Sequence, residues 1–582
     1  MSLALDGLIL VTGWTHVLLA PYTKVEESFN LHAVHDVLMY GVAPSSLPHY
    51  DHFVFSGAVP RTFIGSVLLA WISQPVIYVA HSLGLVGSKF ELQIIVRLVL
   101  ATINALGLCL LRHAVSRRFG RPTGLYYTLL TCSQFHVPFW MGRTLPNMLA
   151  LLPVNLSAYL IIDRAPNTLR PSQKSVGAAI SLLVFSAVVF RAEIAALAGA
   201  LALQSIVLGH TSFWRVFKVC AVSGVASIAL TVGVDSYFWA QPYLWPEWQS
   251  IYFNVVEGKS AEWGIHPAHA YLTTHLPKLL LSSLPLALPA LLPLPFLSSS
   301  PLSRGRRRLV ELILPSAVLV AAMSAVGHKE WRFVVYVVPV WNVVAARGVG
   351  VLLSHPKSTL LGRLLFLAAS ALLLTNIGAT VLLTAAAVRN YPGGEAMAVL
   401  NTKARDNGAP VHAHLTNLAL QSGASLFTHV HAPPYPVLSL LPPVFPPSPS
   451  LTFAASLAPN WVYDKTDSPT SFANYTHVIA ESRTPSPSPS SADAGMFGFM
   501  RKKKEDASAW TELGSIRAFE RWRVDRDVLR RREVLDTETG ETGVEMGMIE
   551  RLSGMLTLEE RERLWVLERA GRGSAGSAKG SD

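Results

Sequence analysis

Long apolar runs separated by short polar segments fill the chain from Leu3 to Val388. A helix needs about 20 consecutive apolar residues to cross the hydrocarbon core of a bilayer. The pattern therefore predicts an all-α polytopic membrane protein with about eleven spanning helices. Their expected ranges are 3–20, 91–112, 122–138, 144–162, 175–190, 194–208, 216–234, 278–297, 309–326, 331–353 and 364–388.

A further apolar run, residues 62–85, contains Pro75 and decides the topology. If it does not cross, the basic residues between the spans share one side, which the positive-inside rule assigns to the cytosol. They are Arg112, Arg117, Arg118, Arg121, Arg164, Arg170, Lys174, Arg215, Lys218, Arg304, Arg306, Arg307, Arg308, Lys357 and Arg363. If residues 62–85 crossed the membrane once, these basic clusters would lie on the side opposite to the N-terminus. We therefore expect a re-entrant or interfacial segment, with the N-terminus cytosolic and the C-terminus lumenal.

Composition agrees with a membrane protein. Of the 582 residues, 51% are hydrophobic and only 15% are charged, whereas soluble domains carry about 25% charged residues. The net charge of +11 is not accompanied by a nucleic-acid-binding motif, and much of it lies in the loops. The three cysteines lie inside apolar segments, so neither a disulfide framework nor a thiol metal site is predicted. The first apolar run lacks a basic start and a clear cleavage site, so we expect a retained anchor.

The character of the chain changes after residue 388. Residues 389–481 predict a small lumenal α/β appendage, with strands at 411–414 and 476–480 around a helix at 418–422. Asn474-Tyr-Thr476 is a glycosylation sequon on the expected lumenal side. Residues 482–582 predict a Pro/Ser-rich linker and a charged, largely disordered tail. A Thr557/Glu560 capping box predicts one helix there, at 557–569.

Two ionisable clusters border the predicted lumenal ends of spans. Glu26 and Glu27 follow the first span, and adjacent like charges raise the pKa of one carboxyl group, which suits a general base. His328, Lys329, Glu330 and Arg332 open another span, and such cations at a helix start attract phosphate. The simpler readings are a solvated acidic pair and snorkelling side chains at a helix end.

Further polar residues share this face. Arg61 and Arg143 are candidates to hold a phosphate or sugar hydroxyls, or they are ion-pair partners. The loop from Asp235 to His275 is rich in Trp and Tyr, which suit either sugar rings or an interfacial belt. We expect Asp51, Glu330, Asp235 and Trp263 to contact substrate. His266 and His269 have no carboxylate at a matching helical spacing, so no metal site is predicted.

These motifs resemble the dolichyl-phosphate-mannose-dependent mannosyltransferases of the endoplasmic reticulum. The family signature, His-Lys-Glu-x-Arg-Phe, stands at 328–333, and the match is closest to the branch that makes an α-1,6 linkage on the lipid-linked N-glycan precursor. The resemblance covers about residues 3–481. The residues that carry it lie in 21–30, 50–52, 59–63, 143–147, 190–191, 234–239, 245–247 and 390–394.

The resemblance implies a GT-C fold, a dolichyl-phosphate-mannose donor and a lipid-linked oligosaccharide acceptor with seven mannoses. The candidate residues do not require a metal for this transfer, so no cofactor is expected. It implies that Glu26 is the base of an inverting transfer and that Glu27 orients it. His328, Lys329 and Arg332 would stabilise the leaving phosphate, assisted by Arg61 or Arg143. Two alternatives stay open. They are a related mannosyltransferase, forming α-1,2 linkages on this glycan or on the glycolipid anchor, and a lipid-linked oligosaccharide transporter.

Overall fold

The computed structural model describes residues 2–164, 168, 170–292, 305–404, 410–435, 461–466, 469, 471–485, 509–524 and 556–570. They form two compact units. The helical unit contains the described residues of Met1–Pro21, Glu26–Thr384 and Pro434–Phe453. The α/β unit contains those of Tyr22–Val25, Ala385–Pro433 and Ala454–Asp582.

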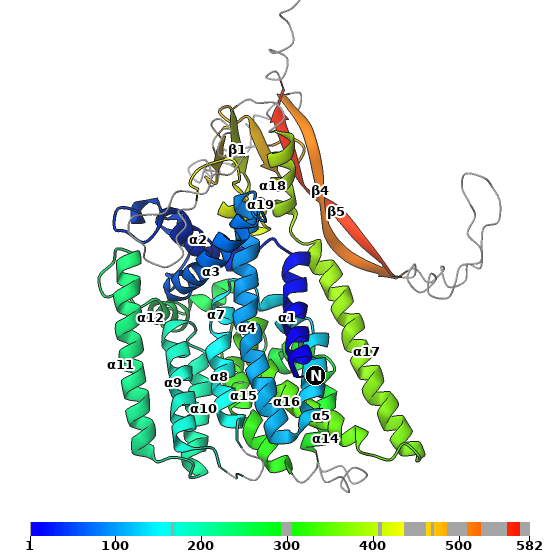
Figure 1. Cartoon of the computed structure of the whole chain (residues 1–582). Helices are drawn as coiled ribbons and strands as arrows, with labels where there is room; N and C mark the ends of the chain where they lie inside the picture. Colours follow the sequence, from blue (N-terminus) through cyan, green and yellow to red (C-terminus); the bar gives the residue numbers. More distant parts are fainter. Residues whose placement is uncertain are drawn as a thin grey trace, which may run out of the picture. The chain divides into compact units, whose positions relative to one another are not determined.

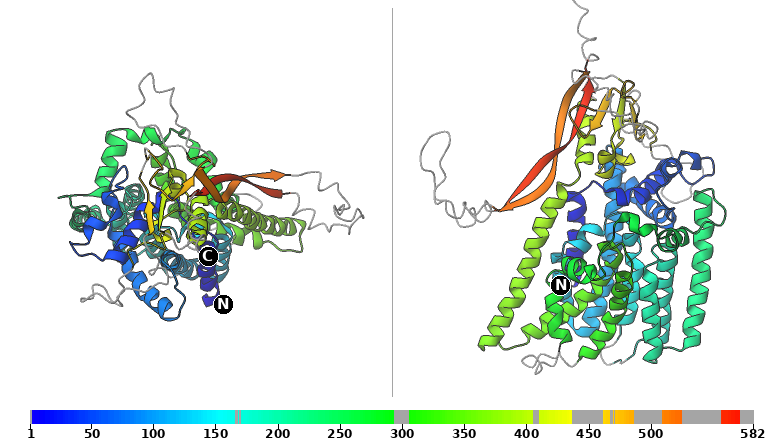
Figure 2. Two further views of the ribbon diagram at one scale, coloured as in Figure 1. Left: turned by 90° about the horizontal axis from the view of Figure 1, so that it is seen from above. Right: turned by 180° about the vertical axis from the view of Figure 1, so that it is seen from behind.

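Long helices lie side by side in the helical unit, and short helices connect them (Figures 1 and 2). The long helices are α1 (Ser2–Leu19), α2 (Val25–Tyr40), α3 (Ile64–Ser82), α4 (Lys89–Phe119), α5 (Arg121–Ser133), α8 (Leu151–Ile162), α9 (Gln173–Val189), α10 (Ile194–Val207), α11 (Phe213–Phe238), α15 (Arg306–Ser324), α16 (Val337–Leu353) and α17 (Leu360–Val388). The short ones are η1 (Leu47–His49), η2 (Asp51–Phe53), α6 (His136–Trp140), α7 (Pro146–Leu149), α12 (Pro246–Ile251), η3 (Tyr252–Val256), η4 (Lys259–Trp263), η5 (Tyr271–His275), α13 (Leu276–Leu280), α14 (Ser283–Leu291) and η8 (Trp331–Val334).

Every apolar run predicted to span a membrane contains one or two of these helices, so the expected helical membrane architecture is confirmed. Among the described residues, five helices are long and apolar enough to cross a bilayer: α1, α3, α4, α11 and α17. Helices α11 and α17 expose most of their apolar side chains, which suits contact with lipid. The number of crossings stays a prediction. Helix α3 lies beside α2 at one end of the unit, inclined to the long helices (Figure 1).

The predicted basic side is one end of the helical unit. Helix α4 ends there, and α9, α11, α15 and α17 begin there (Figure 1). The described basic residues assigned to the cytosol flank these helix ends, and Arg304 lies outside the described residues. Segments far apart in the sequence thus place their positive charges together, as the positive-inside argument expects.

Local sequence sets the ends of α4. Ser88 and Glu91 form a capping box, in which Ser88 Oγ accepts from Phe90 N at 3.2 Å and Glu91 Oε2 accepts from Ser88 N at 2.9 Å. Helix α4 ends at Gly120, whose φ of +96° favours glycine.

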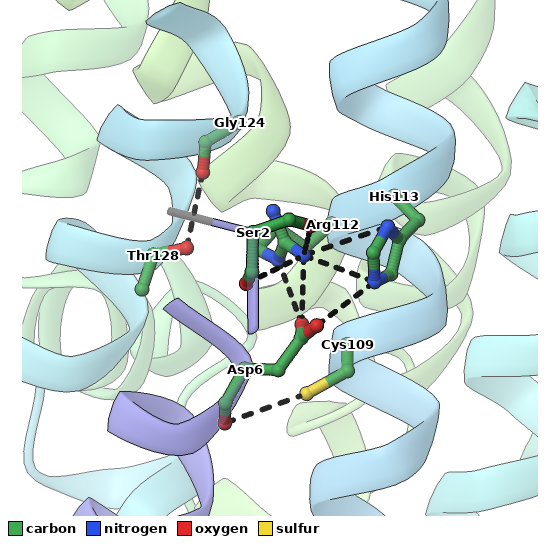
Figure 3. Close-up of polar contacts among 7 residues, drawn as sticks. All are labelled: Ser2, Asp6, Cys109, Arg112, His113, Gly124 and Thr128. Carbon is green, nitrogen blue, oxygen red and sulfur yellow. Dashed lines mark hydrogen bonds and ion pairs between the residues drawn. The ribbon is translucent and has the colours of Figure 1, made fainter. Parts of the chain in front are cut away.

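A partly exposed polar cluster joins the start of α1 to α4 (Figure 3). Asp6 pairs with Arg112 at 2.8 Å and with His113 at 2.9 Å, and Arg112 Nη2 donates to Ser2 Oγ at 2.9 Å. Cys109 Sγ lies 3.8 Å from Asp6 O. A carboxylate within a membrane span requires such partners because unpaired charge is costly there.

The α/β unit is built on a five-stranded sheet in the order β2-β1-β3-β5-β4. Its elements are α18 (Pro392–Lys403), β1 (Val411–Leu415), α19 (Asn417–Gln421), β2 (Trp461–Asp464), β3 (His477–Ala480), β4 (Trp510–Val524) and β5 (Leu556–Arg569). Strand β1 is parallel to β2 and β3, and β5 is antiparallel to β3 and β4. The predicted strands at 411–414 and 476–480 and the helix between them are confirmed. The side chain of Asn474 is exposed, and its glycosylation stays a prediction.

The helix predicted at 557–569 is wrong, because this segment is strand β5. Its Glu- and Arg-rich sequence favours a helix locally, but nearly every residue from Leu556 to Arg569 pairs with a residue of β4 in a long antiparallel ladder. Arg521 and Arg523 of β4 pair with Glu559 across the ladder. Parts of the tail predicted to be disordered therefore belong to the same sheet as the appendage.

Candidate functional site

The two adjacent glutamates at the start of α2 have different surroundings. Glu26 is exposed, whereas Glu27 is fully buried. Consecutive helical residues point about 100° apart, so one can face a substrate while the other faces the core. Both lie in the first turn of α2, where the helix dipole stabilises a carboxylate.

Glu27 is held by an ion pair with Arg143. Glu27 Oε1 and Arg143 Nη1 are 2.7 Å apart, and neither side chain has solvent-exposed surface. The Arg143 guanidinium lies 4.3 Å from the centre of the Phe139 ring. Thr144 Oγ1 also donates to Glu27 O at 3.2 Å. Of the two expected roles of Arg143, the structure shows the ion pair, which neutralises Glu27 and connects the start of α2 to the loop before α7.

Gly142 allows this loop to approach the neighbouring helices. A Cβ at this position would lie 2.5 Å from Val17 Cγ2 and 3.0 Å from Arg97 O. The Gly142 carbonyl accepts from Arg97 Nε at 3.1 Å. The close contact fixes the backbone one residue before Arg143.

The 328–332 segment folds around Glu330. His328 Nε2 lies 3.0 Å from Glu330 Oε1, and Arg332 Nη2 donates to the same oxygen at 2.7 Å. Tyr271 Oη donates to Glu330 O at 3.1 Å. Lys329 is buried and donates to His266 O at 3.2 Å. The predicted cluster is therefore real, but its charges already have partners within the chain.

Asn147 joins this segment to the loop that carries Arg143. Its Nδ2 lies 3.0 Å from Arg332 O and 3.0 Å from Glu193 Oε1. Arg191 Nε donates to the same Glu193 oxygen at 3.0 Å. From Arg143 to Asn147 the chain advances by four residues, which span at most about 14 Å. Through Glu27–Arg143 at one end and Asn147–Arg332 at the other, this short loop links the start of α2 to the 328–332 segment.

Arg61 adds a cation with an unused hydrogen-bond donor. Its Nη1 is buried and has no hydrogen-bond partner among the described residues. Burial, followed by the charge of Arg191, lowers the pKa of Arg61 to about 10, so the guanidinium is charged at neutral pH. Arg332 also acts electrostatically on Arg61. A buried donor among three arginines suits an anion such as a phosphate.

Three residues of this cluster were not singled out as site residues: Arg191, Glu193 and Glu247. Glu247 Oε2 accepts from Ala192 N at 2.8 Å. Burial raises the pKa of Glu247 to about 7, against the opposing charges of Arg191 and Arg61. Arg191 and Glu193 lie between two apolar runs, and Glu247 lies in the loop 235–275, all on the predicted lumenal side. That position is the signal in the sequence, but only the fold shows that they meet.

The expected substrate contacts Asp51 and Asp235 have partners within the protein. Asp51 Oδ2 lies 2.8 Å from His32 Nδ1. Asp235 is fully buried, and its Oδ1 accepts from Phe63 N at 2.7 Å, just before α3. Asp235 thus stabilises the start of α3 rather than presenting a carboxylate to a substrate. The side chain of Trp263 lies outside the described part of the structure. Among the described residues, no group of three His, Cys, Asp or Glu side chains is placed to hold a metal ion.

Comparison of the sequence with known proteins finds a matching family and two similar proteins that share one name. The family described as "Alg9-like mannosyltransferase family" matches residues 7–435. A Drosophila melanogaster protein named "Dol-P-Man:Man(7)GlcNAc(2)-PP-Dol alpha-1,6-mannosyltransferase" is 36% identical over 73% of this chain and 59% of its own length. An Arabidopsis thaliana protein of the same name is 35% identical over 66% of this chain and 71% of its own.

Among solved structures, ArnT from Cupriavidus metallidurans bound to undecaprenyl phosphate aligns with a TM-score of 0.47 and 12% identity. The alignment covers 73% of this chain and 84% of ArnT. The family match covers both the glutamate pair and the 328–333 signature, together with the loop that joins them. The chain belongs to the Alg9-like mannosyltransferase family.

Proposed function

We propose that this chain is a mannosyltransferase of the endoplasmic reticulum membrane. It transfers mannose from dolichyl-phosphate-mannose in α-1,6 linkage to the dolichyl-diphosphate-linked oligosaccharide that carries seven mannoses. The names of the Drosophila and Arabidopsis relatives support the donor, the acceptor and the linkage. The observation that carries the proposal is the 143–147 loop, which connects the glutamate pair to the 328–332 segment.

Glu26 is the proposed general base. Its carboxylate is exposed at the start of α2, whereas that of Glu27 is committed to Arg143. The donor is β-linked and the product α-linked, so a single displacement inverts the anomeric carbon. Glu26 takes the proton of the acceptor 6-hydroxyl as the bond from O6 to C1 forms and the bond from C1 to the phosphate oxygen breaks. Glu27 and Arg143 hold the start of α2 in place.

The departing dolichyl phosphate gains negative charge and needs electrostatic stabilisation. Arg61 is the strongest candidate because it is charged and has a buried, unused donor. Arg332 and His328 can turn from Glu330 toward the phosphate, and the buried Lys329 lies next to His328 in the sequence. In the proposed topology these groups and Glu26 face the lumen.

The test is an assay of the full-length protein with dolichyl-phosphate-mannose and defined lipid-linked acceptors. Glu26→Gln should lower turnover by about 10²- to 10⁴-fold, while binding of dolichyl phosphate stays near the wild-type level. Glu520→Gln, an exposed carboxylate on β4, is the matched control. Wild-type turnover by Glu26→Gln would rule out this base. Wild-type protein that leaves the seven-mannose acceptor unchanged, or forms another linkage, would overturn the function itself.

A further inference from the structure

A cavity of about 90 Å³ lies between helices of the helical unit. It is lined by the end of α4 and by parts of α8, α9, α10, α15 and α16. A single water needs about 10–15 Å³ on the same measure, so the cavity holds a group the size of about six to nine waters. Apolar side chains form much of its wall, including Val154, Ala158, Ile161, Leu183, Leu201 and Leu312.

Three arginines converge at one end of this cavity: Arg118, Arg164 and Arg308. The Nε and Nη1 atoms of Arg164 are buried without a hydrogen-bond partner among the described residues. Burial, followed by the charges of Arg118 and Arg308, lowers the pKa of Arg164 to about 10. Glu311 is the carboxylate among the described lining residues, and it already pairs with exposed Arg307 at 3.0 Å. This end is therefore positively charged, and Arg164 has two buried donors that no described residue satisfies.

Deeper in the cavity, Asn155 presents an unsatisfied amide. It is 1% exposed, and neither Oδ1 nor Nδ2 has a hydrogen-bond partner among the described residues. In a membrane-embedded helix an unpaired polar group costs several kcal/mol, because no water replaces the missing partner. About 10 Å of helix, at 1.5 Å per residue, separates Asn155 from the last residue of α8. A ligand that satisfies both ends is elongated, with an anionic group and a second polar group.

We propose that this cavity binds the headgroup region of a phosphate-bearing glycerolipid. The arginines bind the phosphate, whose negative charge offsets part of their positive charge. Asn155 hydrogen-bonds an ester carbonyl, and the apolar wall covers the first methylenes of the chains. Free phosphate would leave Asn155 and the apolar wall without a partner. The arginines lie at the basic end of the unit, whereas α2 begins the proposed catalytic site at the other end (Figure 1).

The experiment uses purified full-length protein in neutral detergent, and its readouts do not depend on mannose transfer. Thermal unfolding and native mass spectrometry are recorded with dioleoyl phosphatidic acid, dioleoylglycerol or sodium phosphate. Phosphatidic acid should raise the unfolding midpoint saturably and remain bound in the mass spectrum. Dioleoylglycerol and sodium phosphate at the same concentrations should do neither. An equal effect of sodium phosphate would overturn the lipid assignment, and an equal effect of dioleoylglycerol would overturn the arginine site.

Variants separate the two contacts. Arg164→Gln combined with Arg308→Gln should weaken phosphatidic acid binding at least about 10-fold, which corresponds to about 1.4 kcal/mol. Asn155→Leu should weaken it less and raise the stability of the lipid-free protein. Arg215→Gln, an exposed cation at the same end, is the matched control. Because Arg308 is exposed, Arg308→Gln alone serves if the double variant does not fold. Wild-type affinity in the arginine variants would overturn the proposal.

Discussion

At the residue scale, neighbouring charges have opposite roles. Glu26 reaches solvent, while Glu27 and Arg143 form an ion pair without exposed surface. A buried pair contributes little net stability, because desolvation offsets the attraction, but removing one partner is costly. The pair therefore fixes the start of α2, and with it the position of Glu26, more than it stabilises the fold.

A double-mutant cycle tests this role. Arg143→Met should lower the free energy of unfolding by about 3–5 kcal/mol, because it leaves the Glu27 carboxylate buried and unpaired. Adding Glu27→Gln should recover part of that loss, which gives a coupling energy between the two sites. Thermal unfolding in detergent measures both effects. Arg523→Gln, which removes one of the two exposed arginine partners of Glu559, is the control and should leave the midpoint nearly unchanged. Additive losses at Glu27 and Arg143 would contradict the pair.

At the element scale, helix starts and strand partners are set by distant residues. Asp235, at the end of α11, accepts hydrogen bonds from Phe63 N and Thr62 Oγ1 just before α3. Strand β5 acquires its conformation from the β4 ladder and from pairing with β3. A residue distant in sequence thus completes the start of helix α3, and a strand distant in sequence overrides the helical preference of β5.

Replacing Asp235 should loosen the start of α3. Asp235→Leu removes the acceptor for the buried Phe63 N–H, at a cost of about 1–3 kcal/mol for an unsatisfied buried donor. Limited proteolysis should then cut faster within residues 54–62. Asp235→Asn keeps one acceptor oxygen and should behave like the wild type. Equal cleavage of all three proteins would show that the carboxylate does not hold this segment.

A proline in β5 tests the strand against the predicted helix. Val566 pairs with Ile479 of β3 and Gly514 of β4, so Val566→Pro removes a ladder donor in the middle of the sheet. Hydrogen exchange should accelerate in β3 and β4 together. Thr557→Pro, one residue after the start of β5, is the control and should affect the far end of β4 alone. Unchanged exchange in β3 after Val566→Pro would argue against the pairing.

At the scale of the whole molecule, each unit contains a neutral buried histidine. Burial lowers the pKa of His52, in the helical unit, and of His477, in the α/β unit, to about 4 in each case. An exposed histidine in the unfolded chain has a pKa of about 6.5, so the unfolded state takes up the proton first. The stability from these groups is complete above about pH 6.5 and is lost as the pH falls toward 4.

The temperature of the unfolding midpoint should therefore decrease as the pH is lowered from 7 to 5. Each histidine contributes a slope of at most about 1.4 kcal/mol per pH unit in the free energy of unfolding. His477→Phe should flatten this dependence, since the buried ring no longer titrates. Thermal unfolding across the pH range gives the measurement, and His49→Phe, at an exposed position, is the control. A midpoint independent of pH in the wild type would contradict the pKa values.

The sequence by itself determined the helical architecture, the basic side of the bundle and the positions of the family motifs. These properties are local, because a run of apolar residues and its flanking charges need no distant partner to be recognised. The sequence also identified the glutamate pair and the start of the signature, His328 to Glu330, because each is a run of adjacent residues. Only their assignment to one site had to be inferred from topology.

Only the tertiary structure decided the partners. It joined Glu27 to Arg143, used Asp235 to stabilise α3, and brought Arg191, Glu193 and Glu247 to Arg61. It also converted a helix-favouring segment into β5. A side chain's charge is written in the sequence, but its role depends on which distant groups share its buried surroundings. Those contacts form only when the whole chain is packed.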